Sequence, residues 1–446
     1  MTARAWGLAV LLTVVFGLNL RAIGSRDTHV TEFVALSLAA QGNANLDEYP
    51  ALVETGLARG YLTRTTGGHV LSNYPIVPAL VAAPAYWIAV RSGWLDPANP
   101  LPARVEAIGK LVASGLTALA CAVLFIIVER RVGRPALAAA LVTALGTPLW
   151  SSASQALWSH GPAALALAVG LLLTEDSGRD RRSNRGAGVS FAAGLGFGLA
   201  VACRPLLIFF LVAAAVDAIW RKDRRVVWLA AGAVLTLGAV AAYYVLSFGT
   251  LLGGQSALES AVVHQQTHLV DGTFTAVPLA GLAGIAISPS RGVLIFCPIV
   301  IWAAVGAWRA RHDMRALVRL TLPIAAFILA WSQYAVWWGG HSYGPRYLSD
   351  IAIPLGVLLG HGLLPLQRGW GSLRSALAGW SIAVQLVGAV CYPGGAWNSV
   401  PADVDRAHAR LWDWRDSQIV RTARAGPYRR AGAVSDEAAR KTTSGQ

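Results

Sequence analysis

The sequence predicts an all-α, polytopic helical membrane protein with about 11 transmembrane helices, within a range of about 10–13. Of the 446 residues, 55% are hydrophobic and 13% are charged, whereas soluble domains average about 25% charged residues. Apolar runs of about 17–25 residues recur along the chain, and each is long enough to cross the hydrocarbon core of a bilayer. The runs do not alternate between apolar and polar residues, so they indicate helices and not the strands of a transmembrane barrel.

The basic residues indicate membrane topology. The net charge is +14, but the lysines and arginines form short clusters that flank apolar runs, as expected for cytoplasmic loops. We therefore expect no nucleic-acid partner. No GxGxxG or GxxxxGK[ST] motif follows a predicted strand, so nucleotide chemistry is not expected. The four cysteines show no metal-binding spacing, so we assign no metal ligands.

The first apolar run, residues 5–20, follows Arg4 and shows no obvious cleavage site, so it predicts an uncleaved signal anchor with the N-terminus inside. A first outer loop at 21–103 follows. Within this loop, the pattern of apolar and polar residues over 28–40 predicts an amphipathic surface helix. Prolines interrupt the apolar stretch 76–92, which we expect to be an interfacial or half-inserted helix.

The remaining spans follow from the basic clusters, which we use as cytoplasmic markers. If the stretch 276–288 crossed the membrane, the basic cluster that follows it would lie on the outer side. We therefore expect a second half-inserted segment there. The resulting outer loops lie at 150–160, 251–275 and 337–350. The spans expected after the ERRVGR cluster lie at about 135–150, 157–174, 188–203, 205–220, 226–248, 291–308, 317–337, 351–366 and 374–391.

The chain divides into three regions. A transmembrane domain occupies residues 1–391. The segment 392–424 is too polar to span and rich in tryptophan, and we expect it to fold over the outer face. The final residues, 425–446, are polar and without periodicity, so we expect a disordered tail.

Acidic residues in the first outer loop are the candidates for catalysis. Asp27 comes directly after the first span, beside Arg26, and Glu32 follows five residues later. A carboxylate at the membrane face can act as a general base or as a metal ligand. Asp27 can also be only a helix cap, because the helix dipole favours an anion at that position. The sequence leaves both interpretations open.

The outer loops also carry candidates for substrate binding. His160 ends the stretch WSSASQALWSH, and an ionisable group near the membrane is a functional candidate. The loop WWGGHSYGPRYLSD offers aromatic faces for a sugar and a guanidinium for a phosphate, although an aromatic belt with a snorkelling arginine would have the same composition. The complete candidate set for substrate binding is Arg26, His160, Arg204, Arg291, His341, Tyr343, Arg346 and Tyr347.

The order of these features resembles the GT-C superfamily of membrane glycosyltransferases, which includes protein O-mannosyltransferases and bacterial aminoarabinose and arabinofuranosyl transferases. Arg26-Asp27-Thr28, the helix leading to Gln41-Gly42 and the stretch SNYPIVPALVAAP at 72–84 carry the resemblance. It covers residues 1–220, and the later part agrees only in topology. His160 lies where the family often has an acidic residue, which argues against a metal site built from two acidic loops.

The resemblance implies a GT-C-like fold and an inverting glycosyltransferase of the bacterial cell envelope. Such an enzyme moves a sugar from a polyprenyl-phosphate donor to a glycan, lipid or protein acceptor at the outer face of the cytoplasmic membrane. Asp27 would be the base, and outer arginines would stabilise the departing phosphate. No cofactor is certain, and a divalent metal is compatible with the pattern.

Two other functions are compatible with the same residues. One is a transporter or flippase for a lipid-linked or anionic substrate. The absence of an evident inverted repeat and the scarcity of acids within spans, of which Asp217 is the clearest, argue against it. The other is a non-catalytic partner in envelope assembly.

Overall fold

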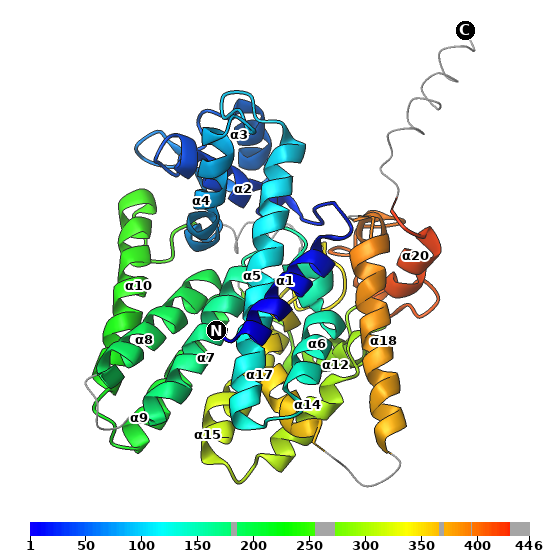
Figure 1. Ribbon diagram of the computed structural model, residues 1–446. Coiled ribbons are helices and arrows are strands. Elements are labelled where there is room, and N and C mark those ends of the chain that lie inside the picture. Colours follow the sequence, from blue (N-terminus) through cyan, green and yellow to red (C-terminus); the bar gives the residue numbers. More distant parts are fainter. Residues whose placement is uncertain (180–184, 255–272, 365–369, 394, 429–446) are drawn as a thin grey trace.

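The computed structural model describes residues 1–179, 185–254, 273–364, 370–393 and 395–428, and it confirms the predicted all-α architecture (Figure 1). The strands of the described part are β1 (Leu62–Arg64) and β2 (Val70–Ser72), which pair as an antiparallel hairpin. Most of the predicted outer loop 251–275 lies outside the described residues, because 255–272 are not described. The same holds for residues 429–446 of the predicted disordered tail.

The helices have the composition of a polytopic membrane protein. Within the described residues, five are long and apolar enough to cross a membrane. They are α5 (Pro102–Arg131), α8 (Arg185–Cys203), α10 (Val226–Phe248), α18 (Trp370–Cys391) and the helical stretch Met314–Gln333, which ends in α16 (Leu322–Gln333). The number of helices that cross remains a prediction. Shorter apolar helices are α1 (Ala3–Gly17), α4 (Ile76–Arg91), α6 (Ala136–Gly146), α7 (His160–Arg179), α9 (Ile208–Trp220), α12 (Pro278–Ile287) and α17 (Leu348–Gly362).

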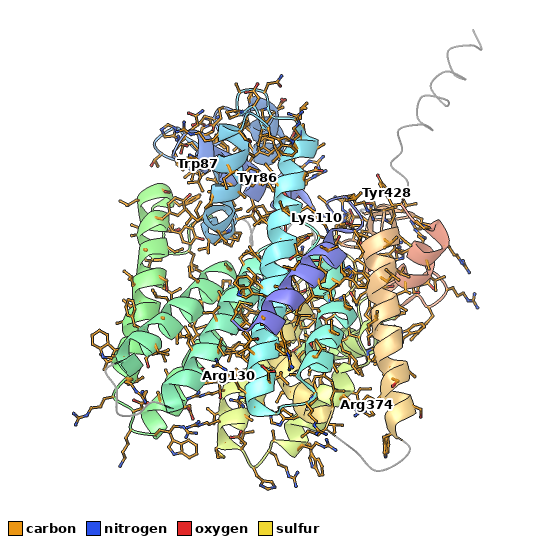
Figure 2. The ribbon with its side chains drawn as sticks, viewed as in Figure 1. Tyr86, Trp87, Lys110, Arg130, Arg374 and Tyr428 are labelled. Atoms are coloured by element: carbon orange, nitrogen blue, oxygen red, sulfur yellow. The ribbon has the colours of Figure 1, made fainter. Side chains whose placement is uncertain are left out.

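The two ends of the bundle differ in character. At one end, α2 (Arg26–Ala40), α3 (Pro50–Ala58) and α4 form a cap above the longer helices (Figure 1). Arg130 and Arg374, from two of the basic clusters, lie at the opposite end (Figure 2). We refer to these as the cap end and the basic end. The separation agrees with the assignment of the first loop and the basic clusters to different membrane faces.

The structure corrects the prediction of an exposed amphipathic helix at 28–40. The helix α2 forms, but every residue from Val30 to Ser37 is buried, because α4 packs along it. The helix N-cap is Ser25, which forms a capping box with Thr28, so Asp27 lies in the first turn and is not itself the cap.

Glycines allow two helices near the basic end to touch through their backbones. A Cβ atom on Gly306 of α14 (Val300–Arg309) would collide with the carbonyl oxygen of Leu358 in α17, and one on Gly362 would collide with the carbonyl oxygen of Trp302. Small residues permit this close packing, as in many membrane helix pairs. The contact fixes α17, whose opposite end carries the groups described in the next section.

The C-terminal segment packs against the loop that precedes α17. Its elements are α19 (Ala396–Ser399), a 3-10 turn at His408–Trp412 and α20 (Gln418–Ala425). Trp397, Val404 and Leu411 form a small apolar cluster with side chains of 335–338. The segment therefore covers the loop 334–347.

Replacing Gly362 with leucine should force α14 and α17 apart. We expect a loss of unfolding free energy of about 1–3 kcal/mol or more, because an inserted side chain has no space between the two backbones. Thermal unfolding of the detergent-solubilised protein would measure it. Gly379→Leu on α18 is the matched control, since a Cβ there meets nothing within 4 Å. Equal melting temperatures for the two variants would contradict the close contact.

Candidate functional site

Five of the candidate residues named from the sequence lie close together beneath the cap, although they belong to distant segments of the chain. Asp27 lies in the first turn of α2, and His160 begins α7. Arg204 follows α8, whereas Arg346 and Tyr347 end the loop before α17. Direct contacts, described below, connect these side chains. The structure therefore gathers one acid, two guanidinium groups and aromatic rings from the two halves of the chain.

A residue that the sequence did not single out, Asp350, connects three of these segments. Its Oδ1 lies 2.7 Å from Nδ1 of His160, and its Oδ2 accepts a hydrogen bond of 2.9 Å from Nε of Arg204. The carboxylate is only 1% exposed. It lies in the first turn of α17, where the helix dipole favours an anion. That position, directly after a loop with arginine and histidine, is the signal that could have identified it.

The exposed part of the site is the pair formed by Asp27 and Arg346. Oδ2 of Asp27 lies 3.7 Å from Nη1 of Arg346, and the side chains keep 22% and 16% of their surface exposed. The other carboxylate oxygen of Asp27 accepts hydrogen bonds from the hydroxyl of Ser25 and the amide of Thr28, which orient the group. A separation of 3.7 Å is longer than a normal hydrogen bond, so the two side chains form an ion pair without a hydrogen bond between them.

Aromatic rings hold the Arg346 guanidinium in place. Its Cζ lies 4.8 Å from the ring centre of Trp158 and 5.3 Å from that of Tyr347. The Nε atom is buried and has no hydrogen-bond partner among the described residues. Arg204 lies 5.1 Å from the same Tyr347 ring, so this ring contacts both guanidinium groups. Arg346 therefore combines a fixed position with an unused donor.

Two tyrosines line the Asp27 side of the site. The rings of Tyr61 and Tyr74 stack with centres 6.1 Å apart, and the guanidinium of Arg26 lies 6.0 Å from the Tyr61 ring. Burial raises the pKa of Tyr74 well above its ordinary value, and the charge of Asp27 raises it further. Tyr74 is thus a neutral phenol next to the carboxylate. Neither tyrosine was singled out from the sequence, where no pattern distinguishes them.

Glu32, the second predicted catalytic acid, lies on the buried side of α2. It is 1% exposed and lies against Gly109 of α5. Burial raises its pKa well above the ordinary value, and the charge of Glu106 raises it further. One of its oxygens has no hydrogen-bond partner in the described part of the chain. This environment favours a neutral, structural carboxylic acid.

The other candidates lie beside the C-terminal segment. Arg291 is 1% exposed and donates to the carbonyl of Gly340 at 3.1 Å and to Asn398 at 2.8 Å, as well as to Gln418. Burial lowers its pKa to about 10. Tyr343 is also buried and donates to a backbone carbonyl of α18. Among the described residues, no hydrogen bond or ion pair connects either side chain directly to Asp27.

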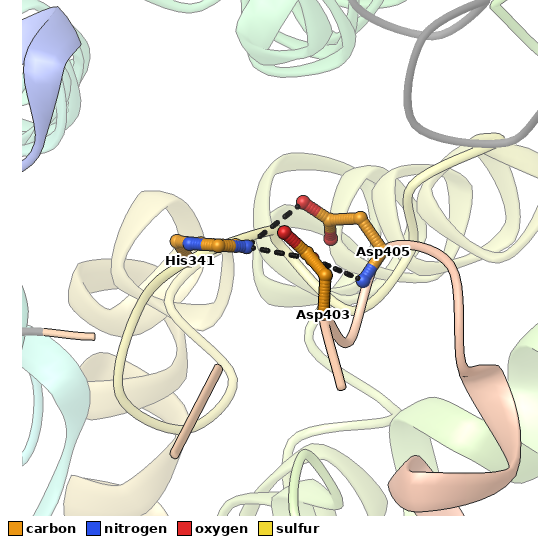
Figure 3. A group of neighbouring side chains, drawn as sticks. All are labelled: His341, Asp403 and Asp405. Atoms are coloured by element: carbon orange, nitrogen blue, oxygen red, sulfur yellow. Dashed lines mark hydrogen bonds and ion pairs between the residues drawn. The ribbon is translucent and has the colours of Figure 1, made fainter. Parts of the chain in front are cut away.

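His341 forms a separate cluster with two acids of the C-terminal segment (Figure 3). Its Nε2 lies 2.9 Å from Asp403 and 3.3 Å from Asp405, and the three potential ligand atoms lie within 4.8 Å of one another. An imidazole and two carboxylates are ligands that divalent metals accept. Burial lowers the pKa of His341, but its hydrogen bonds to Asp405 and Asp403 outweigh burial and raise it. The two acids therefore favour the protonated imidazole, which pairs with them without a metal.

No protein-family model matches this chain, and no curated protein matches it significantly. Among solved structures, the chain is similar to ArnT from Cupriavidus metallidurans bound to undecaprenyl phosphate, with 17% identity, a TM-score of 0.48 and coverage of 86% of this chain and 71% of that chain. It is also similar to the Archaeoglobus fulgidus oligosaccharyltransferase in the apo form, with 12% identity, a TM-score of 0.49 and coverage of 96% and 62%.

A third similar structure is the oligosaccharyltransferase AglB from Archaeoglobus fulgidus in complex with an inhibitory peptide and a dolichol-phosphate. The identity is 12%, the TM-score is 0.46 and the coverage is 97% of this chain and 62% of that chain. Because the TM-scores are below 0.5 and the identities are low, these three similarities do not assign an activity.

Glu32→Gln should be at least as stable as the parent, because glutamine resembles the neutral acid. The pKa of Glu32 is higher in the folded protein than in the unfolded chain. The contribution of Glu32 to the unfolding free energy is therefore complete below the pKa of the unfolded chain, and it is lost as the pH rises through the pKa of the folded protein. The advantage of glutamine should therefore grow with pH in thermal unfolding scans. The exposed Glu54→Gln is the control and should show no such trend. A Glu32→Gln protein that is less stable at every pH would contradict a neutral Glu32.

Proposed function

We propose that this chain is an integral-membrane glycosyltransferase that moves a sugar from a polyprenyl-phosphate donor to an acceptor hydroxyl. The observation that carries the proposal is the pair of Asp27 and Arg346, in which a fixed carboxylate and a fixed guanidinium face each other across 3.7 Å. Transfer from a lipid phosphate needs one group that accepts a proton and another that stabilises a phosphate. The pair supplies both, and the stacked Tyr61 and Tyr74 provide aromatic surface for a sugar beside it.

The proposed step is a single displacement at the anomeric carbon. The acceptor hydroxyl attacks this carbon while Asp27 accepts its proton, so that a new carbon–oxygen bond forms. The bond from the anomeric carbon to the phosphate oxygen breaks, and the electron pair leaves with the polyprenyl phosphate. Attack opposite the leaving group inverts the anomeric configuration. The step needs no nucleotide.

Arg346 is the proposed partner of the departing phosphate, whose negative charge grows in the transition state. Arg204 contacts the same Tyr347 ring as Arg346, so a second guanidinium group lies near a phosphate at Arg346. Asp350 already pairs with Arg204 and fixes its position. His160 and Asp350 are thus proposed as positioning residues, while Asp27 and Arg346 contact the substrates.

The proposed orientation places the site at the outer face of the cytoplasmic membrane. Arg130 and Arg374, from two of the basic clusters, lie at the opposite end of the bundle (Figure 2), and such clusters mark the cytoplasmic side. The acceptor would then be a glycan, a lipid or a protein outside the membrane. Acids within membrane spans often mark transport pathways. Asp217 is already paired with Arg221 at 2.7 Å and with Arg319 at 2.7 Å, so it favours a structural function.

The test is direct transfer. The full-length protein in bilayers is incubated with radiolabelled polyprenyl-phosphate sugars, and the label is followed into an acceptor or into free sugar. We expect release of the sugar from at least one donor. Intact donors that become exposed on the opposite face without release of the sugar would instead support a flippase.

Asp27→Asn should reduce transfer by about 10²–10⁴-fold, the contribution of a general base. Asparagine keeps the size of the side chain, so folding and expression should not change. Glu32→Gln is the matched change from carboxylate to amide on the same helix and should keep transfer within a few-fold of the parent. If Asp27→Asn transfers sugar as well as Glu32→Gln does, Asp27 is only part of a helix terminus.

Arg346→Lys should retain only part of the activity, because lysine keeps the charge but lacks the planar pair of donors. Arg346→Ala should lose more of the transfer activity. It should raise the donor concentration needed for half-maximal transfer more than it raises the corresponding acceptor concentration. Initial rates over a range of donor concentrations would separate the two. If both variants use the lipid donor as the parent does, Arg346 is only an anchor at the membrane surface.

A further inference from the structure

A groove at the basic end of the bundle is unrelated to the proposed transfer site. It lies between α1, α5 and α6 and has a volume of ≈ 750 Å³. This is within the range of about 300–1,000 Å³ that is typical of ligand pockets. The groove lies where α1 begins, where α5 ends and where α6 starts. Figure 2 marks this end of α5 with Arg130.

The wall of the groove is apolar and open. Leu11 of α1 and Leu137 of α6 line it and keep 54% and 51% of their surface exposed. Gly7, between Arg4 and Leu11 on α1, widens it, because a Cβ atom at this position would meet nothing within 4 Å. An exposed apolar surface of this kind in a membrane protein suits a hydrocarbon chain.

Charged groups surround the same groove. Arg4, Arg134 and Glu129 line it, and within the described residues none of their side chains has an ion pair or a hydrogen bond. Two guanidinium groups and one carboxylate leave one positive charge uncompensated. A phosphodiester carries one negative charge and would neutralise it. Basic pockets between helices on the cytoplasmic side are known to bind lipid headgroups in this way.

The groove is too far from Asp27 to serve the donor phosphate. Glu32, five residues after Asp27, lies against Gly109 near the cap end of α5. Phe125, which lines the groove, lies 16 residues further along this helix. At 1.5 Å per residue, the two levels of α5 are about 24 Å apart. A ligand in the groove is therefore a second ligand, and the inference does not depend on the proposed function.

We propose that this groove binds a glycerophospholipid with a singly charged phosphodiester headgroup, of the phosphatidylglycerol type. Its phosphate lies between Arg4 and Arg134, and one of its hydrocarbon chains lies along Gly7, Leu11 and Leu137. The charge balance favours this lipid over a zwitterionic one, which would leave the positive charge uncompensated. It also favours it over a polyprenyl phosphate, whose monoester carries more than one negative charge at neutral pH.

The test is native mass spectrometry of the full-length protein in detergent with added lipids. Dioleoylphosphatidylglycerol, dioleoylphosphatidylcholine and undecaprenyl phosphate are added separately at equal concentration. We expect the parent to retain phosphatidylglycerol most strongly. A basic side chain near an anionic lipid strengthens binding about fivefold, so the double variant Arg4→Gln/Arg134→Gln should bind phosphatidylglycerol about 25-fold more weakly.

Gly7→Phe tests the position of the hydrocarbon chain, because the new ring would project into the groove. It should reduce retention of phosphatidylglycerol with the two arginines intact. Gly17→Phe is the matched control near the other end of α1, where a Cβ also meets nothing within 4 Å, and it should bind like the parent.

Three results would overturn the proposal. Unchanged binding of phosphatidylglycerol to Gly7→Phe and to the arginine double variant would show that the lipid is bound elsewhere. Equal retention of phosphatidylcholine by the parent would reduce the groove to an unselective lipid contact. Stronger binding of undecaprenyl phosphate, lost in the same variants, would replace the proposed occupant by a prenyl lipid.

Discussion

The contacts of one buried carboxylate with a histidine and an arginine determine how the central part of this protein is arranged. Asp350 is 1% exposed and contacts both His160 and Arg204, which precede it by 190 and 146 residues. Removing a partner from a buried charge typically destabilises a protein by about 3–5 kcal/mol. The starts of α7 and α17 and the turn after α8 must therefore meet at this carboxylate. Tyr347 and Arg346, immediately before it, acquire their positions from the same constraint.

A second set of polar contacts fixes the loop on the other side. Gln418 of the C-terminal segment is fully buried, and its amide oxygen accepts a hydrogen bond of 2.8 Å from the backbone N–H of Gly344. Its amide nitrogen donates to the carbonyl of Ser342 at 2.8 Å. Arg291 contacts both Gln418 and Gly340. The C-terminal segment thus shapes the loop that ends in Arg346, although it contributes no group to the Asp27–Arg346 pair.

The sequence was informative where local chemistry determines the outcome. Apolar runs predicted the helical membrane fold, and the position of Asp27 directly after the first of them placed it near the start of a helix at the membrane face. Burial was not predictable, because it depends on segments far away. Arg291 and Arg346 both follow short polar turns with a serine or glycine nearby, yet Arg291 donates to Asn398 and Gln418 of the C-terminal segment, whereas Arg346 lies beside Asp27. The helix at 28–40 has an amphipathic sequence but is covered by α4.

The length of α5 sets the height of the chemistry above the bilayer. The helix has 30 residues, whereas about 20 are enough to cross the hydrocarbon core. If its basic end is level with one membrane surface, about ten residues, or ~15 Å, extend beyond the other. Gly109, which supports α2, lies in this extension, so the cap is supported from outside the hydrocarbon. A polyprenyl donor would then be recognised at the level of its headgroup, and the number of isoprene units in its tail should have little influence on how the sugar is presented.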